Sequence, residues 1–310
     1  MTLMVGSLQL GLIYGLLALG IYITFRILGI PDLTADGSFT LGMSVSAAMT
    51  VLQTADGTVL SLPGLGIFLA FLAGMAAGAV TGCLQTKLGI HPILSGILTM
   101  SGLYTVNLLI LGSRSNVSLI NGVGLFDSLN LMLGGDVDKN LIRTVIPVLF
   151  CVAAFLILSW FFRTHLGLCI RATGNNEDMV TASSINVDAM KITAIAIANG
   201  CVALSGAVLA QYQGYADLSS GTGTVVVGLA SVIIGEVFFG KRSVVIGFAS
   251  AITGAVIYRF LIALALKIDG FPAYALKLVS AVIVIIALSI PTVQAKLRFA
   301  RQKREAKQHA

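Results

Sequence analysis

Long apolar segments occupy most of this 310-residue chain and constrain its fold more than any other feature. A helix that crosses a lipid bilayer needs about 20 predominantly apolar residues. Segments of roughly that character cover 3–25, 39–55, 65–87, 93–112, 142–162, 189–210, 224–240, 244–266 and 276–290. The second, seventh and ninth are short, so about eight to ten spans are expected. The chain is therefore predicted to be an all-α integral membrane protein, a polytopic bundle of about nine transmembrane helices.

Composition agrees with this prediction and excludes several classes of protein. Only 10% of the residues are charged and 57% are hydrophobic, whereas a soluble domain is about 25% charged and about half apolar. A soluble enzyme and a disordered chain are therefore excluded. The net charge of +6 does not indicate a nucleic-acid partner, because nearly all of the excess lies in the last 20 residues.

The distribution of basic residues predicts the orientation in the membrane. Lys and Arg are enriched in cytoplasmic loops. A cytoplasmic C-terminus places thirteen of the nineteen basic residues inside and five outside. With an odd number of spans, the N-terminus then lies outside, in a multi-pass protein of the cell membrane.

One membrane domain is expected over residues 1–290, built from two pseudo-repeat halves of about 1–140 and 141–290. Inverted repeats are common in transporters even where the sequence does not reveal them. Residues 291–310 form a basic tail, which suits attachment to anionic lipid on the cytoplasmic side.

The predicted inner loop, Arg163 to Lys191, is the most polar stretch before the tail. Asn175 or Asn176 can cap a helix whose first turn carries the acidic residues Glu177 and Asp178. We expect a sharp turn at Gly174, a short amphipathic helix on the inner surface, and a new helix cap near Asn186. Such a helix suits the docking of a soluble partner, and an ordinary polar loop is the alternative.

The same loop carries a resemblance to a known family. The pattern T-x-x-G-x-x-x-R-A-x-G-x-N, with the run that follows it, resembles the cytoplasmic loop of ABC-importer permeases of the branched-chain amino acid and ribose type. Residues 11–42, ending in DLTADGSFTLG, resemble the first span and broken segment of a subgroup paired with substrate-binding lipoproteins for tryptophan or tyrosine. Ser184 departs from the family, which often has Gly there. The loop residues concerned are Thr164, Gly167, Arg171, Ala172, Gly174, Asn175, Asn176, Glu177, Asp178, Ala182, Ser184, Ile185 and Asn186.

The resemblance implies a permease that contributes no covalent chemistry of its own. Two copies would enclose one pathway for a small solute, with an aromatic amino acid among the candidates. A binding protein outside would deliver the solute to residues 113–141 and 211–223. Two ATP-binding subunits inside would engage the inner loop through its coupling helices, and ATP and magnesium would bind to those subunits.

Two acidic residues lie four apart between the first two apolar segments. Pro31 interrupts a helix there, and interrupted helices at membrane depth are tolerated where the backbone lines a cavity. We therefore predict a broken or re-entrant segment at the pathway, with a surface loop that caps the next helix as the alternative. The polar residues of this segment are Asp32, Thr34, Asp36 and Ser38.

Other polar residues inside predicted spans are candidates for lining the pathway. They are Asn107, Asn199, Gln211 and Glu236. For the three amides, an interhelical hydrogen bond is an equal alternative. Glu236 lies near one end of its span, so reaching the inner surface is its alternative.

No motif for catalysis or metal binding is recognised. The segment from Gly235 to Arg242 imitates a P-loop, but Arg242 stands where a hydroxyl is needed and the loop interior is bulky. ATP hydrolysis is therefore assigned to a separate subunit, and no cofactor is expected in this chain. An ion-coupled secondary transporter is the alternative function, although it would need acidic groups at the midplane. A membrane-embedded enzyme would need a clustered nucleophile or carboxylate pair near the interface.

Overall fold

The computed structural model describes residues 2–52, 61–120, 122–132, 139–240 and 243–267, together with 278, 280–285 and 289. Helices dominate the fold. The elements are α1 (Thr2–Ile21), the π-helix η1 (Tyr22–Ile27), α2 (Thr34–Thr50), α3 (Pro63–Thr86), α4 (Pro92–Ile110), β1 (Asn116–Ser118), α5 (Leu125–Met132), α6 (Lys139–Phe161), α7 (His165–Asn175), α8 (Glu177–Ala182), α9 (Val187–Gln213), β2 (Tyr215–Asp217), α10 (Thr224–Phe239) and α11 (Val244–Leu266).

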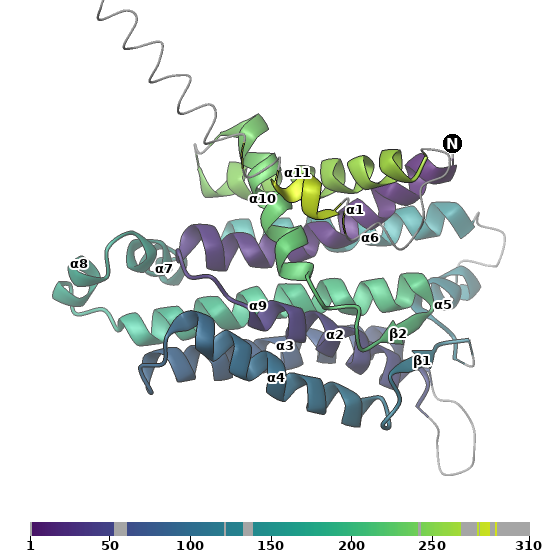
Figure 1. Cartoon of the computed structure of the whole chain (residues 1–310), viewed down its shortest axis with the longest axis horizontal. Coiled ribbons are helices and arrows are strands. Elements are labelled where there is room, and N and C mark those ends of the chain that lie inside the picture. Colours follow the sequence, from purple (N-terminus) through teal and green to yellow (C-terminus); the bar gives the residue numbers. More distant parts are fainter. Residues whose placement is uncertain are drawn as a thin grey trace, which may run out of the picture.

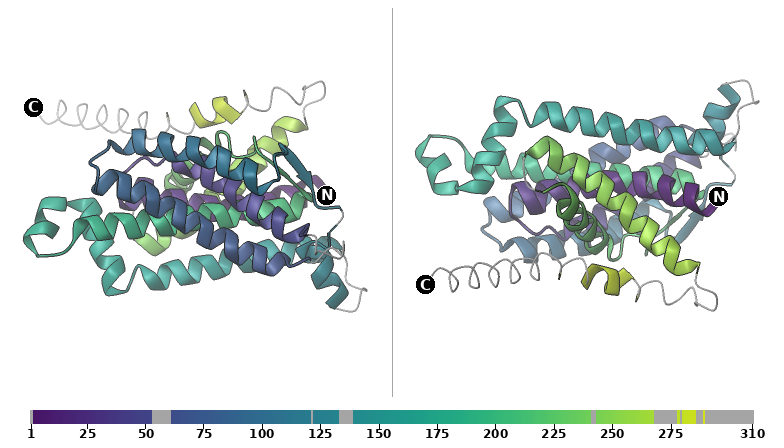
Figure 2. Two further views of the ribbon diagram at one scale, coloured as in Figure 1. Left: turned by 90° about the horizontal axis from the view of Figure 1, so that it is seen from below. Right: turned by 90° about the horizontal axis from the view of Figure 1, so that it is seen from above.

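The long helices run side by side along the long axis of the molecule, and short elements gather at its two ends (Figure 1). Helices α7 and α8 project from one end, called here the α7–α8 end. Helix α5 and the strands lie at the other end, called the sheet end, where α1 begins. Helix α9 is central and packs against α1, α2 and α3, and the two views of Figure 2 show the same division into ends.

Six helices of the described residues are long and apolar enough to cross a membrane. They correspond to the first, third, fourth, fifth, sixth and eighth predicted segments. The second and seventh segments are the helices α2, with 17 residues, and α10, with 16. The ninth, 276–290, lies mostly outside the described residues, and the tail, 291–310, wholly so. The all-α class is confirmed and the count of nine spans is not.

Glycine residues on α3 explain why α3 and α9 can pack so closely. Gly74 and Gly78 lie on the face of α3 that meets α9. A Cβ atom on Gly74 would be 2.5 Å from the Asn199 carbonyl oxygen, and one on Gly78 would be 2.5 Å from the Ile195 carbonyl oxygen. Small residues at this spacing let two backbones touch, which is how membrane helices gain packing energy.

Helices α2 and α10 are interrupted helices. At 1.5 Å per residue they reach about 26 Å and 24 Å, less than the roughly 30 Å of a hydrocarbon core. Residues 28–33 lead into α2 without helical structure, and residues 218–223 form turns before α10. Both helices therefore begin inside the bundle. Their starts create the site described next.

The sheet end is closed by a two-stranded antiparallel sheet that the sequence analysis did not predict. Asn116, Val117 and Ser118 pair with Asp217, Ala216 and Tyr215. Hydrogen bonds from the Ser219 side chain, and also from its backbone, hold the pKa of Asp217 below its ordinary value. This pairing ties the segment after α4 to the segment between α9 and α10.

Candidate functional site

The Asp36 carboxylate joins the start of α2 to the start of α10. Its Oδ2 accepts a hydrogen bond from the Gly223 backbone nitrogen at 2.9 Å. Its Oδ1 accepts from the Val225 backbone nitrogen at 2.8 Å and from the Thr224 hydroxyl at 3.0 Å. The first N–H groups of a helix have no partner within the helix and carry partial positive charge. Asp36 therefore binds the first N–H groups of α10 from another helix. It does not belong to a surface loop that only caps α2.

Asp32 belongs to a second, fully buried network. Its Oδ2 accepts a hydrogen bond from Asn199 Nδ2 at 2.7 Å, and its Oδ1 accepts from the Thr34 backbone nitrogen at 2.9 Å. Ser38 donates to Asn199 Oδ1 at 2.8 Å. The network links the unwound segment before α2 to the middle of α9. The predicted broken segment is thus present, and Asp32, Ser38 and Asn199 meet in it.

A chain of hydroxyl groups extends the network into α3 and α4. The hydroxyls of Thr34 and Thr81 are 2.8 Å apart, and Thr81 donates to Thr99 at 2.9 Å. All three side chains are buried. Sequence analysis named Thr34 but not Thr81 or Thr99, because an isolated threonine in an apolar helix gives no distinctive signal.

Gln211 lies apart from these groups, at the sheet end of α9. Its Nε2 donates to the hydroxyls of Ser46 and Thr50 at 2.9 and 2.7 Å. Its Oε1 accepts from the Leu125 backbone nitrogen at 3.0 Å. Gln211 therefore holds α5 against α2 and α9. For Gln211 the structure therefore shows the interhelical hydrogen bonds that were the alternative to lining the pathway.

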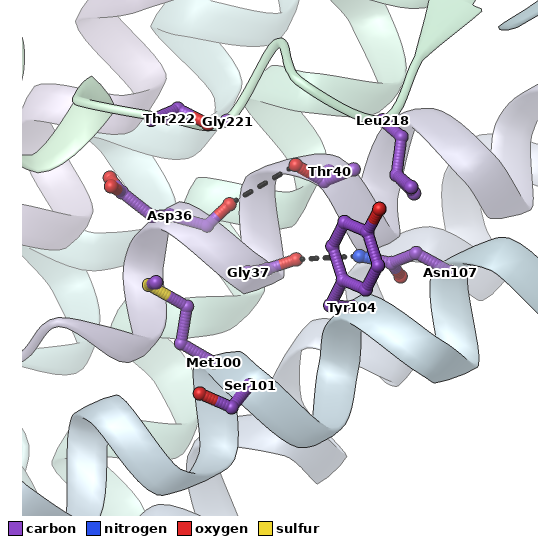
Figure 3. Close-up of a pocket in the computed structure, with 10 residues that line it drawn as sticks. All are labelled: Asp36, Gly37, Thr40, Met100, Ser101, Tyr104, Asn107, Leu218, Gly221 and Thr222. Carbon is purple, nitrogen blue, oxygen red and sulfur yellow. Dashed lines mark hydrogen bonds between the residues drawn. The ribbon is translucent and has the colours of Figure 1, made fainter. Parts of the chain in front are cut away.

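A pocket of about 360 Å³ opens beside the Asp36 junction (Figure 3). Asn107 lies at its wall with 1% of its surface exposed, and its Nδ2 donates to the Gly37 carbonyl oxygen at 3.3 Å. Residues from α2, α4 and the turns before α10 complete the lining. They are Asp36, Gly37, Thr40, Met100, Ser101, Tyr104, Asn107, Leu218, Gly221 and Thr222.

Glu236 does not join the Asp36 junction. It forms an ion pair with Arg26 of η1, with 2.5 Å between Glu236 Oε1 and Arg26 Nε. The pair joins α10 to η1. Arg259 of α11 instead lies over the ring of Tyr14, with its guanidinium carbon 3.6 Å from the ring centroid.

The predicted docking loop folds as two short helices, not one. Thr164 caps α7 by accepting from the Gly167 nitrogen at 3.5 Å, and Asn176 caps α8 by accepting from the Met179 nitrogen at 3.1 Å. Asn186 in turn caps α9, accepting from the Ala189 nitrogen at 3.0 Å. The choice left open between Asn175 and Asn176 is settled in favour of Asn176.

The side chains of the loop divide between inward and outward faces. Val180 is buried, whereas Met179 is 61% exposed. Glu177 pairs with Lys191, with 2.7 Å between Oε2 and Nζ. Asp178 is exposed. Other predicted loop residues fall on α7, on α8 or on the turn that follows α8. These are Arg171, Ala172, Asn175, Ala182, Ser184 and Ile185.

The prediction of a sharp turn at Gly174 is wrong. Gly174 lies in the last turn of α7 and is not among the residues with positive φ. A Cβ atom there would collide with the carbonyl oxygen of Ile27 at the end of η1. Glycine is therefore needed for the close approach of α7 to η1. The positive φ of this region belongs to Ser184, at 59°.

Sequence analysis missed the partners that α10 offers to Asp36. Gly223 and Thr224 end a stretch, 219–224, made of Ser, Gly and Thr, and Val225 follows it directly. A run of small and hydroxyl residues directly before a short apolar segment is the signal that could have identified it. Among the described residues, no group of three or more His, Cys, Asp or Glu side chains could hold a metal ion.

Comparisons with known proteins place the chain in a family. A family model described as branched-chain amino acid transport system / permease component matches residues 3–288. The tyrosine transport system permease protein of Clostridioides difficile is 35% identical over 93% of this chain and 90% of its own length. An uncharacterized protein of Rickettsia prowazekii is 32% identical over 77% of this chain and 79% of its own length. The D-allose transport system permease protein of Escherichia coli is 30% identical over 73% of this chain and 65% of its own length. No solved structure matches the chain.

Proposed function

This chain belongs to the branched-chain amino acid transport system / permease component family, and from that membership we propose that it forms the translocation pathway of an ATP-driven importer for an amino acid, with tyrosine as the first candidate. As a family member it is a multi-pass membrane permease of an ABC transport system, and ATP hydrolysis belongs to a separate subunit. The choice of tyrosine rests on the similarity to the tyrosine permease. The D-allose permease is a more distant relative. Family membership also displaces the alternative of an ion-coupled secondary transporter.

The observation that carries the pathway proposal is the meeting of α2 and α10 at Asp36. Two interrupted helices begin inside the bundle, and a carboxylate of one binds the first N–H groups of the other. Non-helical backbone and charge at membrane depth are tolerated where they line a cavity or a solute pathway. Substrate sites of transporters typically lie at such half-helix ends. The pocket beside Asp36 supports the same position for the solute.

We propose that the α7–α8 end is cytoplasmic and receives the ATP-binding subunits, one for each permease copy. Those subunits would hold ATP and magnesium. The exposed Met179 and Asp178 supply an apolar and an acidic contact on α8. Helix α7 transmits movement because Gly174 lies against Ile27 of η1. The N-terminus is then outside, since α1 begins at the opposite end of the bundle.

The sheet end is the proposed docking surface for an extracytoplasmic binding protein. Its segments 113–132 and 211–223 are joined by the β1–β2 pairing and by Gln211. Ile120 is 87% exposed and Leu131 is 71% exposed, which is the kind of apolar surface that interaction sites present. A second copy of the chain would complete the pathway within the bilayer.

The proposal is tested by expressing the chain with the ATPase and binding protein encoded beside it. We expect stoichiometric co-purification of permease and ATPase. In proteoliposomes that contain the complex, the binding protein and labelled L-tyrosine, uptake should require ATP. Uptake by the permease alone, driven by an ion gradient, would contradict the importer.

The docking end is tested separately with Asp178→Lys. Charge reversal on α8 should lower the recovery of co-purified ATPase several-fold while membrane insertion is unchanged. Asp127→Lys is the matched control, because Asp127 is also exposed but lies on α5 at the opposite end. Equal ATPase recovery with both variants would remove α8 as the docking helix.

A further inference from the structure

We propose that the ion pair between Arg26 and Glu236 couples movement of the α7–α8 end to α10, and thereby to the pocket beside Asp36. The inference rests on the proposed function, because it concerns how an ATP-driven permease transmits movement. It adds two positioning residues, Arg26 and Glu236, which act through α10.

The place of Glu236 is unfavourable for α10 on its own. Glu236 lies in the last turn of a helix that ends at Phe239, and the C-terminal end of a helix carries partial negative charge that disfavours a carboxylate. Its side chain is only 15% exposed, so it has also lost much of its hydration. The Arg26 guanidinium offsets both costs. The C-terminal end of α10 therefore depends on η1 for its stability.

Arg26 belongs to an element that also meets α7. It lies in the last turn of η1, the π-helix that continues α1, and π-helical turns are rare but frequent at functional sites. The next residue, Ile27, is the one that Gly174 of α7 approaches. Arg26 and Gly174 also border one cavity of about 430 Å³. Two consecutive residues of η1 therefore contact α10 and α7.

Polar contacts hold α10 at both of its ends. At its start, the Asp36 carboxylate of α2 binds the first N–H groups, and at its C-terminal end Glu236 binds Arg26. Between these ends, α10 packs mainly against α11. Packed helices can slide past one another by small shear movements. A displacement of Glu236 along α10 would then reach the turn at Thr222, which lines the pocket.

Removing both charges of the pair separates a coupling role from a stabilising one. Loss of one partner leaves the other charge partly buried without a counter-ion, which is strongly destabilising, whereas loss of both together is often tolerated. Arg26→Gln combined with Glu236→Gln therefore removes the ionic link while stability stays close to that of the parent chain. A pair that only stabilises the fold would leave transport intact in this double Gln variant.

Reactivity of the pocket in the reconstituted permease–ATPase complex tests the inference. Thr222→Cys places a thiol in the pocket lining, where Thr222 is exposed. The background carries Cys83→Ser, because Cys83 is exposed whereas the other three cysteines are buried. The reaction rate with a water-soluble thiol reagent is measured in the nucleotide-free and the nucleotide-trapped complex. Tyrosine uptake per ATP hydrolysed and the midpoint of thermal unfolding are measured alongside.

The parent complex should show a several-fold difference in rate between the two states. The double Gln variant should keep its unfolding midpoint and lose most of that difference, and its uptake per ATP should fall at least about fivefold. Arg26→Glu combined with Glu236→Arg, which reverses the pair, should restore both quantities. Lys87→Gln combined with Asp188→Asn is the matched control, because it removes an exposed ion pair between the end of α3 and α9, and it should behave like the parent.

A double Gln variant that keeps the rate difference and the uptake per ATP of the parent would overturn the proposal. So would a reversed pair that is as stable as the parent but transports no better than the double Gln variant. If the double variants do not fold, Arg26→Lys decides, because it keeps the cation. It should retain more uptake per ATP than Arg26→Gln, and an equal loss in the two would contradict the coupling role.

The failure of this inference is distinguishable from a failure of the proposed function. Co-purification of the ATPase and ATP-dependent uptake by the parent chain do not depend on the pair. An importer whose double Gln variant transports as well as the parent retains its function and loses this coupling role. A parent complex without ATP-dependent tyrosine uptake contradicts the proposed function, and the rate difference of Thr222→Cys, which is read without solute, still tests the pair.

Discussion

Asp36 shows how a charged residue is accommodated inside a membrane bundle. A carboxylate at membrane depth is costly unless it has partners. Asp36 has three donors, two of them backbone N–H groups at the start of α10. The charge and the helix dipole stabilise each other, so the junction contributes to the fold as well as to the pathway.

Replacing Asp36 with Asn should therefore destabilise the protein although the two side chains have nearly the same shape. The amide has one acceptor oxygen, and its NH₂ group would face the Gly223 N–H. One partly buried donor then loses its partner, at about 1 kcal/mol, the low end for such a loss. Thermal unfolding in detergent, followed with a thiol-reactive dye that reports the three buried cysteines, measures the change. Asp127→Asn on exposed α5 should alter the midpoint little, and an equal shift in both variants would refute the junction's contribution.

Ser184 is a second residue whose local geometry makes a prediction. Its φ of 59° lies in the left-handed region, which costs a residue with a Cβ atom roughly 1–2 kcal/mol relative to right-handed backbone. Ser184→Gly should remove most of that cost and slow amide hydrogen exchange across residues 176–186. Ser183→Gly is the matched control, since Ser183 has a φ of −85° and gains nothing from glycine. Faster exchange in Ser184→Gly than in the parent protein would contradict this explanation.

At the scale of elements, the contact between α7 and η1 connects the α7–α8 end to the start of α2. Helix α7 lies against Ile27, η1 leads into the unwound residues 28–33, and these carry Asp32 to its network with Asn199. We therefore expect a movement of α7 to reach the start of α2 through this packing contact and the short segment that follows η1. Close packing makes such contacts sensitive to a single added carbon.

Gly174→Ala tests that connection. The added Cβ atom would collide with the Ile27 carbonyl, and overpacking of this kind typically costs 1–3 kcal/mol. We expect ATP-dependent uptake to fall at least about tenfold, with ATPase co-purification retained. Gly102→Ala is the control, because a Cβ atom at Gly102 meets no atom within 4 Å and should be tolerated. Uptake that is equal in the two variants would show that α7 does not act through η1.

Elements whose signal lies within a few neighbouring residues were predicted correctly from the sequence. The caps at Asn176 and Asn186 and the long apolar helices follow from residue type and spacing. The role of Gly174 could not be read in the same way, because glycine in sequence does not reveal whether φ or close packing requires it. Likewise, Asn107, Asn199 and Gln211 look alike in sequence. Only the three-dimensional structure shows that the oxygens of Asn199 and Gln211 accept hydrogen bonds within the protein, whereas the buried Asn107 oxygen has no partner.

At the scale of the whole molecule, the sequence predicted the membrane class and the all-α fold. The positions of Asp32 and Asp36 also predicted the interrupted helix. The meeting of α2 with α10 was not predictable, because it joins residues nearly 190 positions apart through backbone N–H groups. The β1–β2 pairing was missed for a related reason, since each strand has only three residues and carries no periodic signal.

The central claim is that the junction of α2 and α10 lines a pathway that opens alternately to the two sides of the membrane. The most direct measurement is the reactivity of Thr222→Cys, in the Cys83→Ser background, toward a membrane-impermeant thiol reagent in the reconstituted complex. Thr222 lines the pocket beside Asp36. Alternating access predicts that its reaction rate changes several-fold between the nucleotide-free and the nucleotide-trapped complex. Leu149→Cys, on the exposed face of the apolar helix α6, should stay unreactive in both, because an impermeant reagent does not enter the bilayer. A Thr222→Cys that is unreactive in both states, or that reacts at the same rate in both, would contradict the claim.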